Sequence, residues 1–136
     1  MIFKVLTIKE MISLNEDFDN WDILNYNTIT SNNEAFFFCL FDKNILIGFV
    51  KIKINGVESI RSPGFFNWLS FIEVRKDFQR KGFSKKIIFN LFDFLVENNY
   101  SHLLISSYTE EGLFLDKYFK KMQNKYKNII NIKING

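Results

Sequence analysis

The clearest constraint in the sequence is a pair of apolar runs joined by a short polar turn. The run AFFFCLF (35–41) is followed by Asp-Lys-Asn (42–44) and then by ILIGFVKIKI (45–54). Two apolar strands around such a connection are typical of an antiparallel β-hairpin. A sheet is therefore expected, and Asn55-Gly56 is expected to close the second strand with another turn.

Strand and helix patterns follow one another along the rest of the chain. Residues 9–27 mix helix and loop signals without a clear period. The expected strands lie at 1–8, 35–41, 45–54, 65–74, 102–108 and 128–134, and the expected helices lie at 84–98 and 111–123.

The order of these elements predicts the fold class. Hairpins in the first half imply antiparallel pairing, whereas strand–helix–strand connections in the second half imply parallel pairing. We therefore expect an α/β (α+β mixed) fold with a mixed, mostly antiparallel sheet, a parallel central segment and flanking helices. No repeat or low-complexity linker interrupts the sequence, so residues 1–136 are expected to form a single domain.

Composition narrows the class of protein. The net charge of +3 is too small to indicate nucleic-acid binding by itself. Charged residues interrupt every apolar run before it reaches membrane-spanning length, and the N-terminus lacks the pattern of a signal peptide. Cys39 is the single cysteine, which excludes an internal disulfide. These features favour a cytoplasmic protein without membrane contact.

The stretch QRKGFSKKII (79–88) places four cations around one glycine at the start of a helical pattern. The positive end of a helix dipole lies at its N-terminus, so cations are not favoured there unless an anion is shared. A strand, a glycine turn and a helix can offer main-chain N–H groups to a phosphate. Gly82 would permit the turn, and Ser84 could cap the helix. The alternative is that the lysines simply extend into water.

The longer stretch IEVRKDFQRKGFSKKII (72–88) resembles the acyl-CoA signature of the GNAT acetyltransferase family. Val74 ends the strand, Gln79 and Gly82 match the signature, and Ile87-Ile88 match its aliphatic pair. Ser84 stands where glycine or alanine is usual. Upstream, FDKNILIGFVKI (41–52) is similar to the family's hairpin.

The resemblance implies acetyl-CoA as cosubstrate and a primary amine as acceptor, without a metal. In that family the pantetheine arm lies along the strand before the turn, and the main-chain amides of the turn hold the diphosphate. The positions that match are Ile72, Glu73, Val74, Gln79, Arg80, Lys81, Gly82, Phe83, Ser84 and Lys85.

The resemblance also implies a catalytic acid, usually a tyrosine in the last helix. Tyr118 takes that place in one register and Phe119 in the next. The candidate base is Glu73, a carboxylate at an apolar strand end, where desolvation could make it able to accept a proton. The competing interpretation is that Glu73 pairs with Arg75 or Lys76 at the surface.

Two other functions compete with an N-acetyltransferase. One is a catalytically silent acyl-CoA-binding or interaction module on the same fold. The other is nucleic-acid binding through a lysine cluster at 117–127, but a lysine-only patch is weak evidence, so no nucleic acid is expected. The resemblance to the GNAT family also implies that the acceptor, a small molecule or a protein, is bound by residues 9–33 and 57–65. The short C-terminal tail also leaves room for a homodimer by strand exchange.

Overall fold

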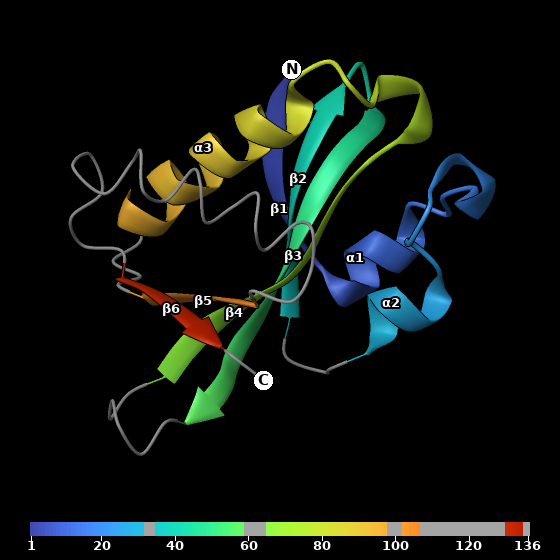
Figure 1. The fold of residues 1–136 in the computed structure, drawn as a ribbon. Coiled ribbons are helices and arrows are strands. Elements are labelled where there is room, and N and C mark those ends of the chain that lie inside the picture. Colours follow the sequence, from blue (N-terminus) through green and yellow to red (C-terminus); the bar gives the residue numbers. More distant parts are fainter. Residues whose placement is uncertain (32–34, 59–64, 98–101, 107–129, 135–136) are drawn as a thin grey trace.

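The computed structural model describes residues 1–31, 35–58, 65–97, 102–106 and 130–134. In these residues the strands form one six-stranded sheet in which spatial order follows chain order (Figure 1). The strands are β1 (Ile2–Thr7), β2 (Ala35–Asp42), β3 (Ile45–Glu58), β4 (Phe65–Val74), β5 (His102–Ser106) and β6 (Ile130–Ile134).

Pairing changes character across the sheet. β1, β2, β3 and β4 pair antiparallel with their neighbours, whereas β4–β5 and β5–β6 are parallel pairs. The predicted mixed sheet, mostly antiparallel and flanked by helices, is confirmed. The parallel pairs form one end of the sheet, however, and not its centre.

Helices lie on both faces of the sheet. The long helix α3 (Phe83–Glu97) lies on one face, and the short helices α1 (Ile8–Ser13) and α2 (Tyr26–Thr30) lie on the other (Figure 1). There are also two 3-10 turns: η1 (Phe18–Asn20) lies between α1 and α2, and η2 (Lys76–Phe78) lies between β4 and α3. Among the described residues, no helix has the length and apolar character needed to cross a membrane.

The weak pattern of residues 9–27 has a local explanation. α1 and α2 are too short for a clear period, and each begins with reciprocal side-chain caps, from Thr7 and Glu10 and from Asn25 and Thr28. Polar capping residues stabilise these helices but do not mark them as amphipathic.

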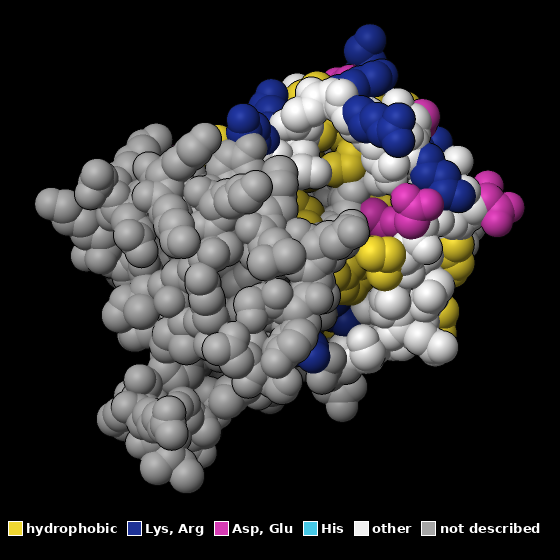
Figure 2. Space-filling view, in the orientation of Figure 1, with side chains coloured by type: hydrophobic (Ala, Val, Ile, Leu, Met, Phe, Trp, Pro, Cys, Tyr) yellow, Lys and Arg dark blue, Asp and Glu magenta, His cyan; other side chains and the backbone are white. Residues whose placement is uncertain are grey.

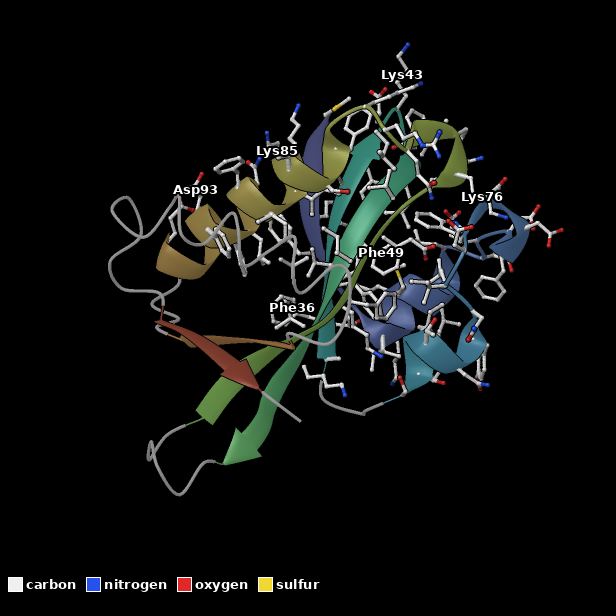
Figure 3. All side chains as sticks on the ribbon, in the orientation of Figure 1. Phe36, Lys43, Phe49, Lys76, Lys85 and Asp93 are labelled. Carbon is white, nitrogen blue, oxygen red and sulfur yellow. The ribbon has the colours of Figure 1, made fainter. Side chains whose placement is uncertain are left out.

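The hydrophobic core has two layers, one on each side of the sheet. Phe36, Phe38 and Leu40 of β2 pack with α3, whereas the alternate residues pack under α1 and α2. Phe36 and Phe49 mark the two layers in Figure 3. Because successive side chains of a strand point to opposite faces, a strand buried on both faces is apolar throughout. This arrangement explains the unbroken run at 35–41.

Two expectations are wrong in detail. Asn55-Gly56 does not form a turn, because β3 continues through it to Glu58 with an irregular register between Lys53 and Val57. Ser84 is not the helix cap, because α3 already begins at Phe83. The strand at 65–74 has the predicted bounds. The predicted helix at 111–123 lies outside the described residues.

Candidate functional site

The end of β4 has an edge that no described strand pairs with. The ladder between β4 and β5 extends only from Asn67 to Leu69 on β4. Beyond it, the N–H of Arg75 donates to Ile47 O of β3 at 2.7 Å. Because neighbouring residues of a strand direct their main-chain groups to opposite sides, those of Ile72 and Val74 point away from β3, although Val74 O already accepts from Gln79 Nε2 at 3.0 Å. An extended ligand could pair there as an additional strand.

The turn that follows has an unusual backbone. Arg80 has a φ of 63° and Gly82 a φ of 81°, so two residues of the turn are left-handed. Such turns can bring successive N–H groups into an anion-binding concavity. A Cβ added at Gly82 would meet nothing within 4 Å, so the glycine is required for its φ and leaves open space beside the turn.

The helix start adds further donors. The first intrahelical bond of α3 runs from the N–H of Lys86 to Gly82 O at 3.3 Å. The N–H groups of the first turn of a helix have no intrahelical acceptor, which applies here to Phe83 and Ser84. Together with the turn, these amides form a place where a phosphate would be bound favourably.

Basic side chains surround the turn. In Figure 2 the lysine and arginine side chains gather at the top of the view, where the turn and the start of α3 lie. Lys81 Nζ lies 5.6 Å from the ring centroid of Phe78, which contacts the ring of Phe83 edge-on. Within the described ranges neither Arg80 nor Lys81 forms an ion pair. The site therefore has a positive potential that favours an anion.

Glu73 is buried and is bound by main-chain amides. Its Oε2 accepts from the N–H groups of Asp22 and Ile23 at 2.6 and 2.7 Å, and Oε1 accepts from Leu24 at 2.8 Å. A carboxylate has about four lone-pair sites, so three amides occupy most of its capacity. This geometry favours an anchor for residues 22–24 over a group that takes a proton from a substrate.

The surface pairing considered for Glu73 does not occur. Arg75 Nε lies 3.1 Å from Asp77 Oδ1, and Lys76 Nζ donates to Asp19 O at 3.0 Å. In Figure 3 Lys76 lies beside the blue segment between α1 and α2, in agreement with this contact. The three residues at the end of β4 and the start of η2 therefore have separate partners.

Lys51 is a second buried charge, on the same face as the Glu73 side chain. Its Nζ donates to Thr28 O and Ser31 O, both at 2.6 Å, and so binds carbonyl groups at the C-terminal end of α2. Burial and the charge of Lys53 lower the pKa of Lys51 to about 8. Glu73 and Lys51 together fix the 22–31 segment against the sheet.

Sequence reasoning missed this role of residues 22–31. Glu73 and Asp22 are 51 positions apart, and no periodic pattern connects them. The other catalytic candidate, Tyr118, lies outside the described residues, as does Phe119, which takes its position in the alternative register. The described site therefore comprises the edge of β4, the turn at 79–82, the start of α3 and the segment held by Glu73.

Comparison with known proteins identifies the family of this chain. The sequence model of the Acetyltransferase (GNAT) family matches residues 6–120. A search of curated protein sequences gives no match. An aminoglycoside acetyltransferase, meta-AAC0020, from an uncultured soil metagenomic sample superposes with a TM-score of 0.57 and 18% identity, covering 88% of this chain and 85% of that chain.

Two further structures show the same fold. A ribosomal-protein-alanine N-acetyltransferase from Brucella melitensis biovar Abortus 2308 has a TM-score of 0.57 and 17% identity, with 89% of each chain covered. The aminoglycoside N-acetyltransferase AAC(6')-Iy, solved in complex with CoA, has a TM-score of 0.54 and 13% identity, covering 89% of this chain and 85% of that chain. At these identities the likeness shows the fold alone.

Proposed function

Because the chain belongs to the Acetyltransferase (GNAT) family, we propose that it moves the acetyl group of acetyl-CoA to a primary amine. The observation that carries this proposal is the turn with left-handed Arg80 and Gly82, which follows the part of β4 that no described strand pairs with. The diphosphate of CoA would bind the amides of residues 80–85. The pantetheine arm would lie along Ile72, Glu73 and Val74.

The site would stabilise the oxyanion, allow proton transfer and hold both reactants in place. The thioester supplies an activated acyl group, and the amine nitrogen forms a bond to its carbonyl carbon while the C–S bond breaks. A main-chain N–H on the open edge of β4 could stabilise the oxyanion. The acceptor ammonium must first lose a proton to water, and the departing thiolate gains one from an acid. Holding both reactants in place provides much of the acceleration.

We assign Tyr118 as the acid that protonates the thiolate. Glu73 was predicted as the base, but its three amide bonds support a role in orienting residues 22–24 beside the acceptor. Tyr118→Phe should lower turnover more than CoA affinity, and equal turnover in the variant would remove Tyr118 from the mechanism.

Calorimetry with CoA and acetyl-CoA tests the binding step. We expect wild type to bind both ligands, and Gly82→Trp to bind neither, because an indole would fill the open space beside the turn. Asn15→Trp is the matched control, since Asn15 is also exposed and left-handed, with a φ of 51°. Equal CoA affinity in Gly82→Trp and Asn15→Trp would contradict the assignment of the turn.

A silent acyl-CoA-binding module remains the second candidate. The engagement of Glu73 favours it, because the predicted base has few lone pairs left for a substrate. Thiol release from acetyl-CoA, measured with a panel of small-molecule and peptide amines, separates the two functions. Release that depends on an amine supports the enzyme, whereas CoA binding without release supports the module.

A further inference from the structure

Gln79 connects the turn to a segment that is distant in the sequence. Its Nε2 donates to Val74 O at 3.0 Å and to Asp22 Oδ2 at 2.9 Å. A primary amide nitrogen carries two hydrogens, and both are used here. Gln79 directly precedes Arg80, the first left-handed residue of the turn. The position of this side chain therefore fixes where the turn leaves β4.

Asp22 is held from a second direction. Its main-chain N–H donates to Glu73 Oε2 at 2.6 Å, while its side chain accepts from Gln79. Lys76 adds a third contact, because its Nζ donates to Asp19 O at 3.0 Å and lies 4.0 Å from Asp22 Oδ1. Side chains of the short stretch 73–79 thus hold residues 19–24 at several points.

We propose that Gln79 and Asp22 are positioning residues that couple CoA binding at the turn to the 19–24 segment. This inference rests on the proposed function, since it takes the turn as the site of the diphosphate. A ligand that requires the observed turn also favours the contact of Gln79 with Asp22, and through Asp22 the amide bonds to Glu73. Coupling between two sites is reciprocal. CoA therefore slows the opening of residues 22–24, and loosening of that segment weakens CoA binding.

Hydrogen exchange of the full chain with and without CoA measures the first half of the coupling. The amides of Asp22, Ile23 and Leu24 exchange only when their bonds to Glu73 open. CoA should slow their exchange roughly fivefold or more, the lower end of typical coupling between sites. In Asp22→Ala the main-chain bonds to Glu73 are retained, but the effect of CoA should be lost.

Calorimetry with CoA measures the second half of the coupling, which is the effect of the 19–24 segment on CoA affinity. Asp22→Ala should bind CoA roughly fivefold more weakly than wild type, the reciprocal of the same coupling. Asp22→Asn should restore the affinity, because its amide oxygen can still accept from Gln79. Asp19→Ala is the matched control: it removes a neighbouring carboxylate but leaves the main-chain carbonyl that binds Lys76. The double variant with Gln79→Ala and Asp22→Ala should bind CoA no more weakly than the single variant that binds it more weakly.

Failure of the proposed function and failure of the coupling alone would give different results. Absence of CoA binding to wild type would overturn the proposed function and this inference with it. If wild type binds CoA but Asp22→Ala matches Asp19→Ala in affinity and keeps the CoA effect on exchange, the coupling alone is wrong. Additive losses in the double variant would show that Gln79 and Asp22 act separately, which also overturns it.

Discussion

Two buried charges in the sheet are bound by main-chain dipoles instead of opposite charges. Glu73 accepts three amides, and Lys51 donates to carbonyl groups at the end of α2; within the described part of the chain neither has an ion pair. A buried charge is tolerated only when its hydrogen-bonding capacity is satisfied. Both side chains therefore act as anchors, and removing either should release a segment that the sheet itself does not bind.

Replacing Glu73 distinguishes its structural role as an anchor for residues 22–24 from a role as the catalytic base. Glu73→Ala leaves the amides of residues 22–24 without their acceptor and should lower the free energy of unfolding by about 2–4 kcal/mol. Glu73→Gln keeps one acceptor oxygen, so its free energy of unfolding should lie between those of wild type and Glu73→Ala. Urea unfolding measures both. Wild-type stability combined with strongly reduced turnover in Glu73→Gln would instead support the base role.

Lys51 should make stability depend on pH in the alkaline range. Its pKa is about 8 in the folded protein and 10.5 ordinarily, so between these values the unfolded chain binds more protons. Stability contributed by this group therefore rises with pH from about 8 to about 10.5, by at most about 1.4 kcal/mol per pH unit. Lys51→Met should remove this rise. Urea unfolding at several pH values checks it, and equal slopes in both proteins would contradict the assignment.

The strands and the long helix were predictable because their apolar patterns are strong. β2, β4 and α3 lie within a residue or two of the expected bounds. The errors arise where local signals compete with tertiary structure. Asn55-Gly56 has turn chemistry, but pairing with β4 extends β3 beyond it. The place of the parallel pairs depends on which strand forms the edge, and local pattern does not contain that information.

Gly48 determines how closely β3, β4 and α3 approach one another. A Cβ there would lie 2.8 Å from Ile87 Cδ1 and 2.9 Å from Glu73 O. Because a main-chain oxygen cannot rotate away, Gly48→Ala should lower the free energy of unfolding by about 1–3 kcal/mol.

The contact with Ile87 can be tested separately. Ile87→Val removes the Cδ1 atom and alone should lower the free energy of unfolding by about 0.5–1.5 kcal/mol. In the double variant with Gly48→Ala the two losses should be less than additive, because the side-chain clash is gone. Urea unfolding of the four proteins measures the difference; strict additivity would show that Ile87 does not restrict residue 48.

The candidate site joins parts of the chain whose predictability differs. The turn at 79–82 and its basic neighbours were predicted from a local motif, since the residues that form it are adjacent. The 19–24 segment was not, because its place depends on hydrogen bonds to Glu73, Lys76 and Gln79, which lie 49 to 57 positions later. Long-range hydrogen bonds leave no period in a sequence.

Binding at this site should stabilise the whole protein. A ligand at a concentration of one hundred times its Kd stabilises the folded state by about 2.7 kcal/mol, which for a chain of this length corresponds to roughly 8–10 °C in Tm. CoA should produce such a shift in a thermal unfolding experiment, and Gly82→Trp should show none. Because the turn is basic, the shift at a fixed CoA concentration should decrease as salt increases. A shift that salt leaves unchanged would argue against the charged turn as the binding place.

The sheet has one further property: its strands stand side by side in the order in which they are synthesised. During translation each emerging strand can therefore join the outer margin of the sheet already formed, and none has to insert between earlier ones. The first four strands and their two short helices precede the turn at 79–82 in the chain. We expect these four strands and two helices, which position the turn, to assemble on the ribosome before the residues that follow the turn have emerged.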